Sequence, residues 1–240
     1  MTLELIKDVA KLALIALCLH LALGAYVRCR QPQWSAFLDK RRLGVLLLLV
    51  LAVTAIKVSE DVVNRESGPV DDLVLRFIHA QVPASLTGFF EAVTLTGSAA
   101  VLFPLASAVV VALMFARRRV EALLITISVT TSALVVYVLK ALVARSRPAL
   151  WETAWYWGSS FPSGHTLVVA AFAGAAAVSA TRIWPARSTA AMLVAGAWVS
   201  TVAMSRLVLG VHWPTDVLAA ACIGACLPLA VGIALDAHRA

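Results

Sequence analysis

The sequence predicts an all-α protein, a polytopic membrane helical bundle, and three observations support this prediction. Of the 240 residues, 61% are hydrophobic and only 14% are charged, whereas a soluble domain has about half apolar and about a quarter charged residues. The mean hydropathy is +0.90. The apolar residues form long runs without charge, each about as long as a helix that crosses a bilayer. These features exclude a disordered, fibrous or ordinary cytosolic protein.

Seven charge-free intervals predict seven membrane-spanning helices. In chain order they cover residues 12–27, 43–56, 92–116, 122–139, 166–181, 188–205 and 217–235. Several are shorter than the roughly 20 residues that a bilayer requires, but polar ends and snorkelling cations such as Lys57 extend a span. A cleaved secretory signal is the alternative for the first interval. Arg28 and Arg30 directly after it favour a retained helix.

Basic residues predict how the bundle is oriented. They gather in four segments: Arg28, Arg30, Lys40, Arg41 and Arg42; Arg117, Arg118 and Arg119; Arg182 and Arg187; and Arg239. Short basic loops stay in the cytoplasm, so we expect a cytoplasmic C-terminus and an external N-terminus. Residues 64–91, 145–160 and 206–216 then lie at the extracytoplasmic face. The net charge of +7 is therefore interpreted as a topology signal rather than a nucleic-acid footprint.

One external segment, residues 70–95, predicts an interfacial amphipathic helix followed by a turn. In this segment, Asp71 and Asp72 are followed by the apolar residues Leu73, Leu75, Phe77 and Ile78, and then by Pro83 and Phe89-Phe90. A solvated connection is an equal alternative. The tryptophans fit aromatic belts at the two interfaces, with Trp34 and Trp184 on the inner side and Trp151, Trp155, Trp157 and Trp213 on the outer side.

Lys140 and Arg147 form the first cluster of polar residues that needs an explanation. Seven residues are almost two helical turns, so both cations would face one cavity if the helix continued that far. Pro148 disfavours helical geometry at Arg147 and is expected to end the helix there. The alternative is a snorkelling group of cations that includes Arg145.

The second cluster is Phe161-Pro162-Ser163-Gly164-His165, directly before a predicted span. Ser163 is a good helix cap, Gly164 lets a ligand approach the backbone, and the first amides of the helix have no intrahelical acceptor. Such a helix start binds anions. The alternative is an ordinary turn at a helix start, with His165 as an interfacial imidazole.

The third cluster runs from Ser205-Arg206 through His212 to Asp216, and Pro214 suits the first position of the last helix. A carboxylate one turn from an imidazole can accept its N–H, fix the tautomer and leave the other nitrogen as a base or nucleophile. The alternative is that Asp216 only complements the helix dipole. Taken together, the cations and helix amides suit a phosphoryl group, and two imidazoles suit a nucleophile and a proton donor.

These clusters resemble a known family. Residues 140–148 match K-x6-R-P, residues 162–165 read P-S-G-H, and residues 205–216 match S-R-x5-H-x3-D. They are similar to the three signatures of the type 2 phosphatidic acid phosphatase family of membrane lipid phosphatases, which shares its active site with vanadium-dependent haloperoxidases. The resemblance implies a six-helix core, with residues 1–42 as an added helix and basic loop and residues 43–240 as the membrane domain.

The resemblance also implies roles for the signature residues. His212 would attack phosphorus and form a phosphohistidine, Asp216 would orient it, and His165 would protonate the leaving group, which implies a bell-shaped dependence on pH. The phosphate oxygens would be held by Lys140, Arg147, Arg206, Ser163 and Gly164. The family needs no metal or cofactor.

The resemblance implies a phosphatase in the cell (inner) membrane with an extracytoplasmic, periplasmic site. Its substrate would be a lipid phosphomonoester or pyrophosphate, such as undecaprenyl pyrophosphate, phosphatidylglycerol phosphate or phosphatidic acid. Expected partners are this lipid and membrane lipids, with no nucleic acid. A lipid phosphotransferase with the same intermediate and a non-catalytic lipid transporter are the alternatives.

Overall fold

The computed structural model describes residues 2–151 and 158–238, and in these ranges all regular structure is helical. The all-α prediction is therefore confirmed. The α-helices are α1 (Thr2–Arg30), α2 (Ser35–Val63), α3 (Gly68–Gln81), α4 (Thr87–Thr96), α5 (Ala99–Phe115), α6 (Arg119–Val143), α7 (Gly164–Ile183), α8 (Ser188–Val208) and α9 (Pro214–Ala237). Short 3-10 helices cover Pro32–Trp34, Ala84–Leu86 and Pro185–Arg187.

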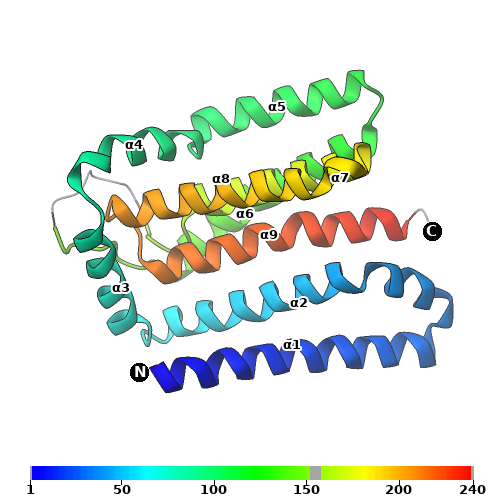
Figure 1. Ribbon diagram of the computed structural model, residues 1–240, viewed down its shortest axis with the longest axis horizontal. Helices are drawn as coiled ribbons and strands as arrows, with labels where there is room; N and C mark the ends of the chain where they lie inside the picture. The colour runs from blue at the N-terminus through cyan, green and yellow to red at the C-terminus, as the bar shows by residue number, and fades with distance from the viewer. Residues whose placement is uncertain (1, 152–157, 239–240) are drawn as a thin grey trace.

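Six helices in the described ranges are long and apolar enough to cross a membrane: α1, α2, α6, α7, α8 and α9. They run side by side with their axes nearly aligned (Figure 1). Helix α7 is the most buried of them and packs against α6, α8 and α9. The outer helices expose large apolar side chains, including Leu142 and Leu193. Such a surface is stable only in lipid, so the chain is a multi-pass integral membrane protein.

Helices α7 and α9 pack closely because small residues line their contact. A Cβ atom on Gly224 of α9 would lie 2.4 Å from the carbonyl oxygen of Leu167 in α7. A Cβ atom on Gly174 of α7 would lie 2.8 Å from Pro228 of α9. Glycine at these positions lets the two backbones approach as membrane helices commonly do. The contact fixes the start of α7 beside the start of α9.

The prediction of one span over residues 92–116 is wrong in its boundaries. The structure ends α4 at Thr96 and starts the 17-residue α5 at Ala99, with Ser98 in an extended conformation between them. Gly97 lies so close to its neighbours that a Cβ atom there would be 2.9 Å from Val202 and 3.1 Å from Val169. Docking against α7 and α8 therefore fixes the break. Helix α5 is apolar but shorter than the six candidate spans, and it runs along the bundle beside them (Figure 1).

Residues 70–95 form α3 and most of α4, which bend by 92° relative to each other. The predicted helix is present as α3, and one of its faces is buried, since Asp71 and Leu75 are both 0% exposed while Phe77 is 63% exposed. Its position at the membrane interface stays a prediction. The alternative of a solvated connection is wrong for this segment, because α3 packs against α8 and α9.

The two ends of the bundle carry different loops (Figure 1). The connections α1–α2, α5–α6 and α7–α8 and the end of α9 lie at one end, and the three basic segments of the described residues lie at these connections. Arg239 lies outside the described residues. Helix α3, the start of α7 and the connection α8–α9 lie at the other end. The basic segments thus share one end, as the predicted orientation requires. The assignment of that end to the cytoplasm stays a prediction.

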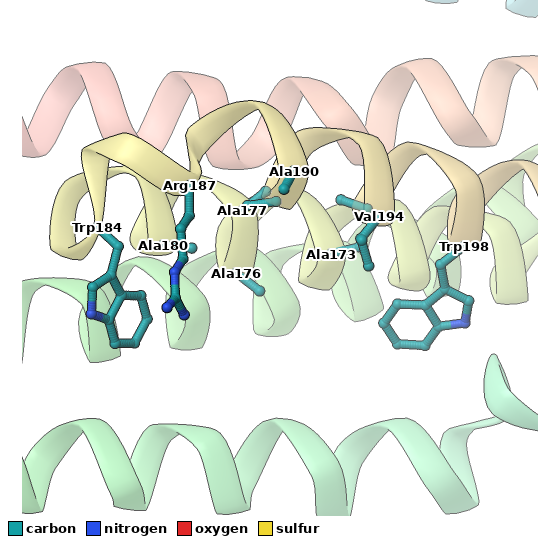
Figure 2. Close-up of a pocket in the computed structure, with 11 residues that line it drawn as sticks. Ala173, Ala176, Ala177, Ala180, Trp184, Arg187, Ala190, Val194 and Trp198 are labelled. Atoms are coloured by element: carbon teal, nitrogen blue, oxygen red, sulfur yellow. The ribbon is translucent and has the colours of Figure 1, made fainter.

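An apolar groove of about 430 Å³ separates parts of α7 and α8 (Figure 2). It is lined by Ala173, Ala176, Ala177, Ala180, Trp184, Arg187, Ala190, Ala191, Val194, Ala195 and Trp198. The signature residues do not line it, so this groove is distinct from the candidate site.

Candidate active site

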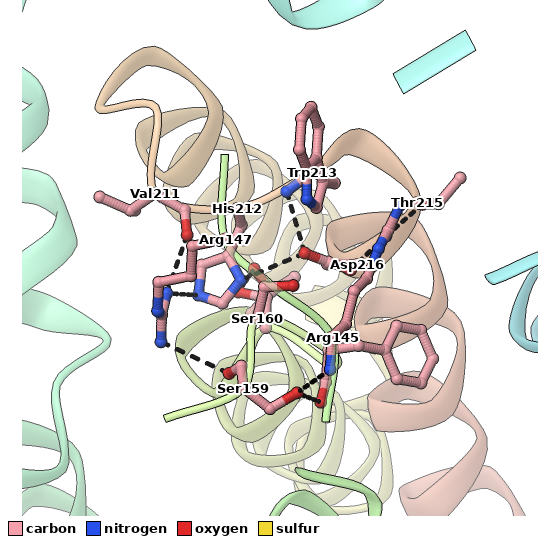
Figure 3. Close-up of polar contacts among 12 residues, drawn as sticks. Arg145, Arg147, Ser159, Ser160, Val211, His212, Trp213, Thr215 and Asp216 are labelled. Atoms are coloured by element: carbon pink, nitrogen blue, oxygen red, sulfur yellow. Dashed lines mark hydrogen bonds and ion pairs between the residues drawn. The ribbon is translucent and has the colours of Figure 1, made fainter. Parts of the chain in front are cut away.

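The three signature clusters meet at the end of the bundle where α3 lies. The first occupies the end of α6 and the loop that follows, the second begins α7, and the third joins α8 to α9. Figure 3 shows the residues that connect the first and third clusters.

Lys140 and Arg147 reach the same backbone group from different elements. Helix α6 ends at Val143, and Ala144 takes a left-handed conformation with φ 47°. Arg147 therefore lies on a loop, and the helix ends at Val143, earlier than the predicted end at Arg147. The Lys140 ammonium donates to the carbonyl of Ser159, and Arg147 Nη2 donates to the same oxygen at 3.5 Å. The two cations are brought together by the loop rather than by helical spacing.

His212 lies in the connection between α8 and α9 and is 2% exposed. Its Nδ1 atom is 3.6 Å from Asp216 Oδ2, slightly beyond hydrogen-bond distance. On the other side of the ring, Arg147 Nη1 lies 3.3 Å from Nε2 and donates to the carbonyl of Val211 at 2.8 Å (Figure 3). A guanidinium can only donate, so Nε2 carries the lone pair and Nδ1 carries the proton that faces Asp216.

The tautomer of His212 matters because the ring is neutral at physiological pH. Burial lowers the pKa of His212 to about 4, and the charges of Arg206 and Arg147 act in the same direction, while Asp216 opposes them. A neutral imidazole with a free lone pair on Nε2 is the form that acts as a nucleophile.

Asp216 is fully buried in the first turn of α9, which begins at Pro214 as predicted. Its Oδ2 atom accepts from the backbone N–H of Trp213 at 2.9 Å. The N–H of Ser163 donates to the backbone carbonyl of Asp216 at 3.2 Å. This bond joins the second cluster to the third.

The second cluster caps α7, with Ser163 at the N-cap position and Gly164 as the first helical residue. The expected side-chain cap is missing: the Ser163 hydroxyl lies 3.0 Å from the hydroxyl of Thr166 instead. His165, in the first turn, interacts electrostatically with His212, Lys140, Arg147 and Arg206. The positive end of α7 therefore adds to the same cationic cluster.

Arg206 lies in the last turn of α8 and is only 1% exposed. Its Nη1 atom donates to the hydroxyl of Thr94 in α4 at 2.7 Å. Its charge acts on Lys140, His165 and His212. The described ranges therefore combine all eight predicted residues at one end of the bundle: Lys140, Arg147, Ser163, Gly164, His165, Arg206, His212 and Asp216.

Sequence reasoning missed two charged residues beside the site, the buried Asp71 and the partly buried Arg145. Arg145 entered the prediction only as part of a snorkelling alternative, but it forms ion pairs of 2.6 Å with both Asp71 and Asp216. One signal for Asp71 was available, since it lies four residues before Leu75 and so shares the apolar face of its helix.

Other predictions concern metals and the aromatic belt. Among the described residues, no three His, Cys, Asp or Glu side chains gather as a metal ion would require.

The outer-belt assignments of Trp155 and Trp157 lie outside the described residues. Trp151 stacks on His79 of α3 with a centroid distance of 3.9 Å, and Trp213 donates to the carbonyl of Ser146 at 3.0 Å.

Comparison with known proteins finds relatives among the PAP2 phosphatases. The family model described as PAP2 superfamily matches residues 121–236. Phosphatidylglycerophosphatase B of Escherichia coli K12 is 39% identical over 66 residues, which are 28% of this chain and only 25% of that protein. Lipid A 1-phosphatase of Rhizobium johnstonii is 30% identical over 165 residues, which are 62% of this chain and 64% of that protein.

Two crystal structures share the fold. The transmembrane PAP2 type phosphatidylglycerolphosphate phosphatase from Bacillus subtilis superposes with a TM-score of 0.69 at 25% identity, over 82% of this chain and 97% of that one. LpxE from Aquifex aeolicus gives a TM-score of 0.55 at 23% identity, over 66% of this chain and 92% of that one. The matched region and this fold confirm the resemblance to the PAP2 family that the three signatures predict.

Proposed function

We propose that this protein is an integral membrane lipid phosphate phosphatase, which hydrolyses a phosphomonoester or pyrophosphate of a lipid through a phosphohistidine. The observation that carries the proposal is the arrangement of His212, which is buried and neutral and lies between Arg147 and Asp216. The names of the relatives, phosphatidylglycerophosphatase B and lipid A 1-phosphatase, support a lipid substrate. The site opens on the extracytoplasmic side of the cell membrane in this proposal.

The first step is attack by His212 Nε2 on phosphorus. A nitrogen–phosphorus bond forms, the phosphorus–oxygen bond to the leaving group breaks, and His165 donates a proton to the departing oxygen. Because Arg147 Nη1 is 3.3 Å from Nε2 before substrate binds, it must turn from the ring to a phosphate oxygen as the substrate enters. Water, activated by the now neutral His165, then hydrolyses the phosphohistidine.

Stabilisation of the phosphoryl group comes from fixed positive charge. Lys140, Arg147 and Arg206, with the first amides of α7, neutralise the oxygens whose charge the transition state redistributes. Three cations and a helix start provide the neutralisation that other phosphoryl-transfer enzymes obtain from magnesium. The proposed reaction therefore proceeds without a metal.

The proposal is tested by phosphate release from a panel of lipid phosphates in detergent micelles. The panel contains phosphatidic acid, phosphatidylglycerol phosphate and undecaprenyl pyrophosphate, and the purified chain is assayed without an added acceptor and with a chelator. We expect release of inorganic phosphate from at least one lipid. Cleavage only when an acceptor lipid is present would indicate a phosphotransferase, and binding without cleavage would indicate a transporter.

A further inference from the structure

A second buried carboxylate, Asp71, lies beside the site but outside the three signatures. It belongs to α3 and is 0% exposed. Its Oδ1 atom accepts from the N–H of Thr215 at 2.9 Å, and its Oδ2 atom accepts from the Thr215 hydroxyl at 2.7 Å. Asp71 thus caps the start of α9, the helix whose first turn carries Asp216.

Arg145 joins this carboxylate to Asp216. Its Nη2 atom donates to Asp71 Oδ2 at 2.6 Å and to the hydroxyl of Ser67 at 3.0 Å. Its Nη1 atom donates to Asp216 Oδ1 at 2.6 Å and to the Thr215 hydroxyl at 2.9 Å. Two parallel sides of one planar guanidinium therefore hold two carboxylates, a geometry that lysine cannot reproduce.

The consequence for Asp216 is that its two oxygens have separate partners. Oδ1 accepts from Arg145, while Oδ2 accepts from the N–H of Trp213 and faces His212 Nδ1. A carboxylate can rotate about its last bond, but the short contact to Arg145 fixes one oxygen and so directs the other to the imidazole. Arg145 also balances the negative charge that would otherwise act fully on His212.

We propose that Arg145 and Asp71 are positioning residues for the His212–Asp216 pair, with Arg145 orienting Asp216 and Asp71 orienting Arg145. This inference rests on the proposed phosphatase function. Through Asp71, helix α3 would then help to set the geometry of the site, although it carries none of the signature residues.

Titration of His212 distinguishes this positioning role of Arg145 and Asp71 from a purely structural role, in which the two residues only hold α3 on α9. The charged groups that act on the ring are Asp216 of α9, Arg206 of α8 and Arg147 of the loop after α6, together with His165 of α7. Lys140 of α6 belongs to the same cluster. Removing Arg145 leaves Asp216 without its counter-charge, which favours protonated His212 and raises its pKa. Removing the charge of Asp71 acts in the opposite direction.

The experiment compares Arg145→Met, Arg145→Lys and Asp71→Asn with the matched control Asp72→Asn. Asp72 is the next residue on α3 and accepts from Arg76 at 2.8 Å in an exposed ion pair. We measure kcat, KM and the acid limb of kcat/KM for lipid phosphate hydrolysis in micelles, and the titration of His212 by NMR of histidine-labelled protein.

For Arg145→Met we expect kcat to fall about 10- to 100-fold, the range typical when a partner that orients a functional side chain is lost, with KM within about twofold. The His212 titration moves to higher pH in Arg145→Met and to lower pH in Asp71→Asn. Arg145→Lys should restore the His212 titration of the unmodified chain but only part of its kcat. The lysine ammonium keeps the positive charge, but it cannot bind both carboxylates as the planar guanidinium does. Asp72→Asn changes neither quantity.

An unchanged kcat in folded Arg145→Met, or a reduced kcat with an unmoved His212 titration in both variants, would overturn the proposal. If Arg145→Met does not fold, Thr215→Val serves instead, because it removes a hydroxyl that contacts both Asp71 and Arg145 while keeping every charge; it should lower kcat with KM unchanged. If the unmodified chain hydrolyses no lipid, the proposed function fails, and the NMR titration still tests the coupling of Arg145 to His212.

Discussion

At the scale of single residues, burial decides what His212 can do. An exposed imidazole has a pKa near 6.5 and is partly protonated at neutral pH. Burial and the neighbouring guanidinium groups lower the pKa of His212 to about 4, against the raising effect of Asp216. In the proposed mechanism, His212 is therefore an uncharged nucleophile at neutral pH, and Asp216 orients the ring without protonating it.

The first prediction concerns pH. Because only neutral His212 attacks, kcat/KM should fall as the pH drops through about 4, the pKa of this ring in the free enzyme. Asp216→Asn removes a group that raises this pKa, so the remaining activity should retain its neutral nucleophile to still lower pH. A pH profile of initial rates checks both expectations. An acid limb near 6.5 in the unmodified chain would show that burial does not control the titration.

A second residue-scale prediction is that His212→Ala lowers kcat by on the order of a thousandfold or more, the loss typical of a missing nucleophile. The protein should remain folded, because His212 lies in a connection between helices rather than in the apolar core. His238→Ala is the control, since His238 is exposed in the last turn of the chain that the structure describes. Turnover of His212→Ala at the normal rate would exclude His212 as the nucleophile.

At the scale of elements, close packing of α7 against α9 sets the geometry of the site. The N–H of Ser163 reaches the carbonyl of Asp216 because these two helices start side by side. Glycines in the contact permit this approach, since Gly224 lies against the backbone of Leu167. The small side chains of α7 are therefore structural, but they determine where His165 and His212 can meet.

This packing gives a third prediction. Gly224→Ala places a methyl group 2.4 Å from a backbone oxygen, which cannot move as a side chain can. We expect a loss of about 1–3 kcal/mol of stability, measured as a lower midpoint of thermal unfolding in detergent. Gly196→Ala is the matched control, because a Cβ atom there meets nothing within 4 Å. The control should be as stable as the unmodified chain or more stable, since alanine favours helix.

The elements also show how far the sequence alone predicts this protein. Long charge-free runs predict six of the observed helices, because a helix that crosses the hydrocarbon core of a membrane needs a continuous apolar stretch. The break at Gly97 was not predicted, since hydropathy does not change there and only contact with Val202 and Val169 reveals it. The eight signature residues were found because their spacing is distinctive. The link from Arg145 to Asp71 was not, because it joins residues 74 positions apart that no local pattern connects.

At the scale of the whole molecule, charge separates the two ends of the bundle. The three basic segments of the described residues lie at one end and the candidate site at the other. Such a distribution orients a membrane protein with its basic end in the cytoplasm. A lipid phosphate in the outer leaflet would then meet the cationic cluster without crossing the membrane.

The fourth prediction follows from this orientation. A single cysteine at Arg118, in a background without Cys18, Cys29, Cys222 and Cys226, should resist a membrane-impermeant thiol reagent in intact cells and react after permeabilisation. A single cysteine at Arg65, in the α2–α3 connection, should react in both conditions. The opposite pattern would place the candidate site in the cytoplasm.

The account as a whole depends on transfer of a phosphoryl group to His212. The most direct measurement is mass spectrometry of the His165→Ala variant, quenched in alkali during turnover of a lipid phosphate that the unmodified chain hydrolyses. Loss of the base that activates water should slow the second step, so an acid-labile phosphoryl group is expected on the peptide that contains His212. A phosphoryl group on another residue, or release of phosphate with His212 unmodified at every time point, would contradict the account.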